Sequence, residues 1–282
     1  GERDLFTTRT IRGGPHGKMR GPLSFRVGCE WRSAAEPLNV GDIVAPAGFV
    51  RYRQQMAAAG APVSFRLPSA SNNVRTTLFV RLGCIGAAAT GGRFAAGGIV
   101  TSANPLLCGN RSLWWGFKRR RNVDGIVHAA AGPGLAAECD ALPAVGPEGE
   151  KLLLGSVRAT GAHELVAKSV LHALSPTSHR SPRGEGVLRQ TYESCLRVAD
   201  AHGLASLALP ALGCGINAFP PAVSARAALD AVDHVLIAGA EAAACAPATT
   251  LLEFVLLDEQ CYAAFADAAH ARWGGGGGRR ES

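Results

Sequence analysis

The sequence predicts an α/β domain over residues 76–272, because from Thr76 onward short strand-like runs alternate with longer windows of helical amphipathicity. The composition agrees with a folded domain: of the 282 residues, 18% are charged and 47% are hydrophobic. No apolar run approaches the roughly 20 residues that a membrane-spanning helix needs. We therefore expect a folded α/β domain without membrane contact.

The expected elements follow from local patterns. Strands are expected at short apolar runs, and helices where apolar residues recur at three- and four-residue spacing. Gly132-Pro133 should break or kink the first helix, and Gly203 should end the second. The expected strands are residues 77–82, 98–102, 170–174, 204–209 and 251–257. The expected helices are residues 124–142, 187–202, 222–237 and 258–272.

Residues 1–75 differ from the rest of the chain in charge. They hold eleven Lys and Arg against five Asp and Glu, and so carry +6 of the net charge of +7. A basic segment can bind RNA, anionic lipid or a phosphate-bearing ligand, but a solvated surface or the remnant of a transit peptide explains the charge equally well. We expect a Gly/Pro/Arg-rich extension, with a strand or two added to the domain edge as one alternative, and a flexible Gly/Arg tail over residues 273–282.

The eight cysteines are scattered along the chain, without a Cys-x-x-Cys pair or a histidine cluster at ligand spacing. This pattern argues against a zinc site or a disulfide framework, so we expect reduced thiols, no metal and no cofactor. Reduced thiols indicate an intracellular protein. Because the chain opens at Gly1 and a targeting segment can precede it, cytoplasmic and mitochondrial locations both stay open.

Two strand-to-helix connections carry candidate functional residues. The first joins the run IVTSAN, which ends at Asn104, to a helix that starts near Asp124. Ligands collect beyond the carboxyl ends of strands in open α/β sheets, so a carboxamide and a carboxylate are well placed there. Asp124 has a second interpretation as a helix cap, because exposed N–H groups favour a carboxylate.

The second connection is the glycine-rich loop over residues 210–220, PALGCGINAFP. Glycines between a buried strand and a helix let backbone N–H groups approach an anion without obstruction by a Cβ atom, as phosphate-binding loops require. Any tight strand-to-helix turn can need glycine as well. The loop is therefore a candidate anion site with an ordinary structural alternative.

Together these motifs resemble the macro domain family, over most of residues 76–272. IVTSAN at residues 99–104 is similar to the family's IVNAAN, and VDGIVHAAAGP at residues 123–133 is similar to its VDGAIHRAAGP. The run KSVLH at residues 168–172 resembles a family strand that ends in Ile-His. Residues 209–220 resemble the loop PAISTGIYGFP, and Leu256-Leu257-Asp258 with Tyr262 resembles the closing strand and helix.

The resemblance implies a mixed β-sheet between helices on both faces, with ADP-ribose bound at the strand ends. By analogy the loop after residue 209 would wrap the diphosphate, Asn104 would bind the terminal ribose, and Phe219 would pack against that ribose. In hydrolytic members the residue that matches Asp124 helps to activate water, which suits a carboxylate that can accept a proton. The implied catalytic residues are Asn104 and Asp124. The implied ligand-binding residues are Gly213, Cys214, Gly215, Ile216, Asn217, Ala218, Phe219, Ala103 and Cys84.

The chain departs from the family pattern in several places. Cys84 stands where the family has an Asp for the adenine amino group, Thr101 replaces the first Asn of the strand motif, and Asn217 replaces an aromatic residue. A longer stretch replaces the family's glycine run between Asn104 and Asp124. That stretch contains Trp114, Trp115, Phe117, Lys118, Arg119, Arg120 and Arg121, which can stack on a base and neutralise phosphates, or can simply anchor a long loop.

Three functions fit these observations. The first is a hydrolase that removes ADP-ribose from modified proteins or acts on related derivatives. The second is a reader that binds ADP-ribose or an ADP-ribosylated protein without turnover. The third is a degenerate macro fold that serves as a structural subunit of an RNA–protein assembly such as a cytosolic or mitochondrial ribosome, in which the basic extension and Lys118 to Arg121 would contact RNA. His128 and His172 lie in apolar runs, so we expect both to be structural.

Overall fold

The computed structural model describes residues 62–68, 76–86, 97–109, 122–177, 183–239 and 247–274. The chain divides into a unit of residues 1–58 and a unit of residues 59–282, and all described residues belong to the second. Most of the basic extension, the aromatic and basic run over residues 114–121 and the tail from residue 275 onward lie outside the described residues.

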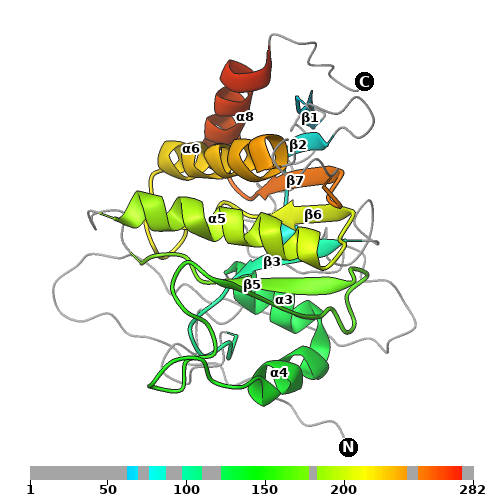
Figure 1. Ribbon diagram of the computed structural model, residues 1–282, viewed down its shortest axis with the longest axis vertical. Coiled ribbons are helices and arrows are strands. Elements are labelled where there is room, and N and C mark those ends of the chain that lie inside the picture. The colour runs from blue at the N-terminus through cyan, green and yellow to red at the C-terminus, as the bar shows by residue number, and fades with distance from the viewer. Residues whose placement is uncertain are drawn as a thin grey trace, which may run out of the picture. The chain divides into compact units, whose positions relative to one another are not determined.

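The described residues form a seven-stranded sheet with the order β1-β2-β7-β6-β3-β5-β4 (Figure 1). Neighbouring strands from β2 to β5 in this order are parallel, whereas β1 and β4 pair antiparallel at the two edges. The expected mixed sheet is thus confirmed. The carboxyl ends of its five parallel strands all lie at the same end of the sheet. The strands are β1 Val63–Arg66, β2 Thr77–Leu82, β3 Gly98–Ser102, β4 Val157–Gly161, β5 Ser169–Ala173, β6 Ser206–Leu209 and β7 Leu251–Leu256.

Helices cover both faces of this sheet. On one face lie α3 (Val123–Ala130) and α4 (Gly132–Ala141). On the other lie α5 (Gly184–Ala201), α6 (Pro221–Val232) with its π-helical continuation η2 (Asp233–Ala238), and α8 (Glu259–Trp273) (Figure 1).

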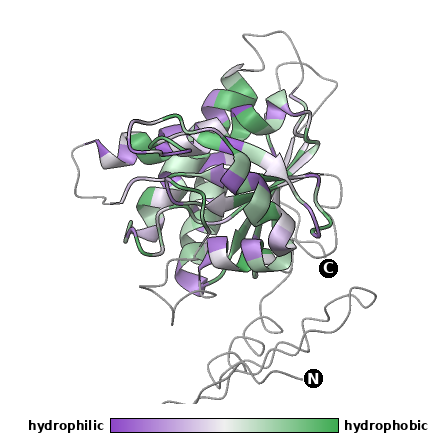
Figure 2. Ribbon diagram, turned by 90° about the horizontal axis from the view of Figure 1, so that it is seen from below, coloured by the Kyte–Doolittle hydropathy of each residue, from purple (hydrophilic) through white to green (hydrophobic). Residues whose placement is uncertain are grey.

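The strand side chains alternate between the two hydrophobic cores that these layers form. In β3, Ile99 packs in the core under α3 and α4, and Val100 packs in the core under α5, α6 and α8. Figure 2 colours the ribbon by hydropathy and shows hydrophobic and hydrophilic residues interspersed along the helices that surround the sheet.

The break that the sequence predicts within residues 124–142 is confirmed. α3 ends at Ala130 and α4 begins at Gly132, whose φ of 73° lies in the left-handed region. A Cβ atom at Gly132 would lie 2.2 Å from Oε1 of Glu164, an exposed side chain that can move, so the left-handed φ is the main reason for glycine at this junction.

Of the two edge strands, β1 is a strand of the kind that the sequence allowed as one alternative for residues 1–75, and β4 was not expected. β1 falls within the residues 1–75 that the sequence sets apart as an extension, and pairs with β2 in the register Val63 to Val80. β4 was not predicted from the sequence, because four of its five residues are half-buried and its pattern VRATG shows neither a continuous apolar run nor clean alternation.

Candidate functional site

The parallel strands bring separate chain segments together at their carboxyl ends. Ala103 and Asn104 follow β3, residues 210–220 follow β6, and Ser175 lies just beyond β5. β3 lies between β6 and β5 in the sheet, so the segments after these strands are neighbours. The side-chain amide of Asn217 donates a hydrogen bond to Oγ of Ser175 over 3.1 Å, which joins the loops on either side of β3.

Cys84 lies at the same end of the sheet, two residues after β2, and is half-buried. The segment that follows it packs closely on α3: a Cβ atom at Gly86 would lie 2.4 Å from Cγ2 of Ile126. Ala103 is also half-buried, and its N–H donates to the carbonyl of Ala173 over 2.9 Å. These contacts connect the ends of β2 and β3 to α3 and β5.

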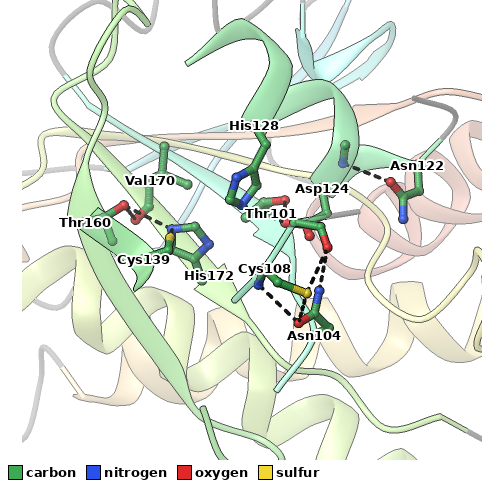
Figure 3. A network of polar contacts seen from close by, with 12 residues as sticks. Thr101, Asn104, Cys108, Asn122, Asp124, His128, Cys139, Thr160, Val170 and His172 are labelled. Atoms are coloured by element: carbon green, nitrogen blue, oxygen red, sulfur yellow. Dashed lines mark hydrogen bonds and ion pairs between the residues drawn. The ribbon is translucent and has the colours of Figure 1, made fainter. Parts of the chain in front are cut away.

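Asp124 lies in the first turn of α3, and the helix does not use it as a cap. The cap is Asn122, whose side-chain oxygen accepts a hydrogen bond of 2.9 Å from the N–H of Gly125. The capping interpretation of Asp124 is therefore wrong. The Asp124 side chain is instead directed toward β3, where its Oδ1 accepts a hydrogen bond of 3.0 Å from Oγ1 of Thr101 (Figure 3).

Burial controls the ionisation of Asp124. The residue is 3% exposed, and the loss of solvation raises the pKa of its carboxyl to about 7, while the hydrogen bond from Thr101 opposes this rise. Nε2 of His128, one turn further along α3, lies 3.7 Å from Oδ1. A carboxyl with a pKa near neutrality can both accept and release a proton at physiological pH, as a general base requires.

His128 and His172 belong to a polar cluster beside Asp124 (Figure 3). The centroids of their two rings lie 5.7 Å apart. Nε2 of His172 lies 3.0 Å from Oγ1 of Thr160 and 3.7 Å from Sγ of Cys139. Burial lowers the pKa of His172 to about 3, so its ring is neutral. Its Nδ1 is buried without a hydrogen-bond partner among the described residues.

This cluster has the spacing of a metal site, since possible ligand atoms of His128, Cys139 and His172 lie within 4.8 Å of one another. As they lie in the structure, these side chains form a polar cluster. Burial raises the pKa of the Cys139 thiol to about 11, which leaves it protonated at neutral pH, and Oγ1 of Thr160 lies 3.0 Å from Nε2 of His172. That both histidines are structural stays a prediction.

Asn104 uses its side chain within its own loop. Its Oδ1 accepts hydrogen bonds from the N–H of Leu106 over 3.1 Å and of Cys108 over 3.3 Å. Its Nδ2 donates to the carbonyl of Gly109 over 2.8 Å. In this conformation Asn104 fixes the turn after β3, and both ends of its carboxamide already have partners (Figure 3).

The glycine-rich loop after β6 presents backbone N–H groups. Within it, the N–H groups of Cys214, Ala218 and Phe219 donate to loop carbonyls. Those of Gly215, Ile216 and Asn217 donate to no acceptor in the described part of the chain. Ile216 is 78% exposed at the tip, so these three consecutive groups lie where an anion can reach them.

Gly213 and Phe219 shape the base of this loop. The φ of Gly213 is 82°, and a Cβ atom there would lie 2.8 Å from Cδ2 of Phe219. Phe219 is 2% exposed and packs in the core under α5, α6 and α8. The structure thus places Phe219 as an internal support of the loop, where the resemblance had implied a ribose contact.

Sequence reasoning missed two residues that hold this loop. The N–H of Leu212 donates to the hydroxyl of Tyr192 over 2.7 Å, and Oγ of Ser224 donates to the carbonyl of Leu212 over 2.8 Å. The two hydroxyls lie 2.8 Å apart, so the Tyr192 hydroxyl donates to Ser224 and the hydrogen bonds form a closed ring. The one available signal was a Tyr on the apolar face of α5, where a buried hydroxyl needs a partner.

Comparison with known sequences identifies relatives for this chain. The sequence pattern of the family described as Macro domain matches residues 103–228. A macro domain-containing protein of Streptomyces coelicolor is 33% identical over 174 residues, which cover 62% of this chain and 90% of that protein. A protein of Enterobacter cloacae named O-acetyl-ADP-ribose deacetylase is 33% identical over 163 residues, which cover 57% of this chain and 79% of the relative.

Solved structures agree on the fold. A macrodomain of Oceanobacillus iheyensis with ADP superimposes with a TM-score of 0.59 at 23% identity, over 75% of this chain and 97% of that one. A macrodomain of Trypanosoma brucei in complex with ADP-ribose gives a TM-score of 0.53 at 23% identity, over 68% of each chain. In the part of the chain that the structure describes, no helix is both long enough and apolar enough to cross a bilayer.

Proposed function

Because the chain belongs to the macro domain family, we propose that it binds ADP-ribose and holds the diphosphate with the backbone of the loop after β6. The observation that carries this proposal is the run of N–H groups of Gly215, Ile216 and Asn217, which find no acceptor among the described residues. Such a run of amides suits a diphosphate, whose oxygens accept charge-assisted hydrogen bonds. ADP and ADP-ribose occur in the solved structures of similar fold.

The chain hydrolyses a bond at the distal ribose, either in ADP-ribosylated proteins or in a related ester of ADP-ribose. Asp124 is the general base of this reaction. Water forms the new bond to the carbon under attack, and its proton passes to the carboxylate of Asp124. The bond from that carbon to the leaving oxygen breaks with both electrons on the oxygen, which departs as a carboxylate or takes up the proton from Asp124. The carboxyl suits this role because burial raises its pKa to about 7. The deacetylase names of relatives such as that of Enterobacter cloacae support an ester substrate.

Replacement of the base tests the proposal. Wild type and Asp124→Asn are incubated with a mono-ADP-ribosylated protein and with O-acetyl-ADP-ribose, and the released ADP-ribose is measured by chromatography. The variant is expected to be slower by about a hundredfold or more, the usual contribution of a general base. Asp267→Asn, an exposed Asp on α8, is the matched control and should match wild type. Equal rates for wild type and Asp124→Asn would contradict a hydrolase that depends on Asp124.

A second candidate function is a reader that binds ADP-ribose without turnover. The observation in its favour is Asn104, whose carboxamide is engaged with Leu106, Cys108 and Gly109 and would have to leave this turn to contact a ribose. A reader is identified if wild type binds ADP-ribose but releases none from either substrate at any pH. The RNA-assembly hypothesis depends on residues outside the described ranges, and salt-dependent RNA binding tests it.

A further inference from the structure

Thr101 occupies an unusual place for a hydroxyl. It lies in the central strand β3, opposite His172 of β5 in the register, and is buried. Alternation along the strand puts its side chain on the same face as Ile99, toward α3 and α4. A hydroxyl there loses its water and needs a partner within the protein. That partner is Oδ1 of Asp124, at 3.0 Å.

The contacts of Asp124 fall on one of its two carboxyl oxygens. Oδ1 accepts the hydrogen bond from Thr101 and lies 3.7 Å from Nε2 of His128. The carboxyl is therefore held through Oδ1, and no described residue donates a hydrogen bond to Oδ2.

We propose that Thr101 is a positioning residue for the hydrolysis: its hydroxyl holds Oδ1 of Asp124 and thereby makes Oδ2 the oxygen that takes the proton from water. This inference rests on the proposed function. The direction of the bond supports it, because Thr101 donates to Oδ1 and a proton that arrives at the carboxyl then goes to Oδ2.

The same hydrogen bond keeps the base ionisable. Burial pushes the pKa of Asp124 upward, and the bond from Thr101 favours the ionised form. Among the described residues, none of the other titratable groups around the carboxyl has a hydrogen bond to it in the structure. His128 lies on the same helix at 3.7 Å from Oδ1, Cys139 of α4 carries a thiol with a raised pKa, and His172 of β5 is neutral.

The test compares Thr101→Val, which keeps the shape of the side chain without the donor, with Thr101→Ser, which keeps the donor. The pKa of the Asp124 carboxyl is measured directly by carbon NMR, and the pH dependence of hydrolysis is measured in parallel. In Thr101→Val we expect both midpoints to move up by about one pH unit, and kcat at pH 7 to fall about fivefold. The Kd for ADP-ribose should stay unchanged, and Thr101→Ser should restore both midpoints.

The outcomes separate this inference from the proposed function. If wild type hydrolyses the substrate and Thr101→Val keeps the wild-type midpoints, or if Thr101→Ser is impaired as much as Thr101→Val, the positioning role is wrong. If wild type releases no ADP-ribose, the proposed function is wrong, and the NMR titration still decides whether Thr101 controls the carboxyl. Unchanged ADP-ribose binding shows that Thr101→Val is folded, and Thr101→Ala provides a second variant without the hydroxyl.

Discussion

Asp124 meets two opposed requirements at the residue scale. Its burial raises the carboxyl pKa to about 7, whereas a general base must be ionised. The rate of hydrolysis should therefore rise with pH from about 5.5 to 8, with a midpoint near the raised pKa. Initial rates at constant ionic strength over this range provide the measurement. A rate that is flat above pH 5 would show that the active carboxyl has an ordinary pKa.

Burial of the same carboxyl predicts a stability that depends on pH. The pKa rises from 3.8 to about 7 on folding, so the favourable contribution of the protonated carboxyl is complete below pH 3.8 and is lost as pH rises through about 7. Asn does not ionise, so Asp124→Asn does not lose stability at this position as the pH rises. The free energy of unfolding of Asp124→Asn, relative to wild type, should grow by on the order of 2 kcal/mol between pH 5 and pH 8. Urea unfolding at both pH values measures it, and a constant difference would show that burial does not tune Asp124.

Single residues were predicted from the sequence with mixed success, for physical reasons. The motif around Asp124 located the carboxylate, but the sequence alone did not decide whether Asp124 caps the helix. In the structure Asn122 accepts the capping hydrogen bond from the N–H of Gly125. The resemblance implied a ribose contact for Phe219, and Tyr192 was not singled out from the sequence. Their roles, one as a wedge under Gly213 and the other as an anchor of Leu212, depend on contacts between distant segments that periodicity does not encode.

At the scale of elements, the loop after β6 depends on helices α5 and α6 for its shape. Tyr192→Phe removes the hydroxyl that accepts from the N–H of Leu212 and donates to Ser224. The N–H of Leu212 and the hydroxyl of Ser224 then lose a hydrogen-bond partner in a buried place. We therefore expect a loss of about 1–3 kcal/mol in the free energy of unfolding and weaker ADP-ribose binding. Thermal or urea unfolding and a binding titration measure the two effects.

Ser194→Ala is the control for this change. It also removes a hydroxyl hydrogen bond of α5, to the carbonyl of Gly155, but away from the loop. It should lower stability without a change in affinity. If Tyr192→Phe and Ser194→Ala affect affinity alike, the ring of hydrogen bonds does not shape the loop.

Two glycines of this loop give opposite predictions. Gly213→Ala forces a side chain into the left-handed region at φ 82° and places its Cβ 2.8 Å from Phe219, so we expect destabilisation of about 1 kcal/mol or more. A Cβ at Gly215 meets nothing within 4 Å, and Gly215→Ala should keep the wild-type melting temperature. Differential scanning calorimetry compares the two. Equal effects would show that the base of the loop is not as tightly packed as described.

The type of most elements was predictable because their burial is regular. The parallel strands in the middle of the sheet are apolar runs. Gly132 indicates the break between α3 and α4. β4 was not predicted, because most residues of this edge strand are half-buried and its sequence lacks the apolar pattern of a buried strand. Local sequence also did not indicate that α6 continues as the π-helical η2.

At the scale of the whole described domain, function depends on strand order. The sheet places β6 beside β3 and β3 beside β5. The loop after β6, the turn of Asn104 and the loop of Ser175 therefore lie at the same end of the sheet. No single segment encodes this order, since it arises from pairings between strands far apart in the chain. The resemblance to the macro domain family predicted a mixed sheet with the ligand at the strand ends, and the strand order itself was not predicted.

The central claim is that backbone N–H groups of the loop after β6 hold the diphosphate of ADP-ribose, and an isothermal titration tests it most directly. Ile216→Pro removes one of these N–H groups, whereas Ile216→Ala truncates the same exposed side chain and keeps the N–H. Wild type and Ile216→Ala should bind one ADP-ribose with similar Kd values, and Ile216→Pro should bind about tenfold more weakly or less well still, as expected for the loss of a hydrogen bond to a charged group. No binding by wild type, or equal Kd values for Ile216→Pro and Ile216→Ala, would contradict the account.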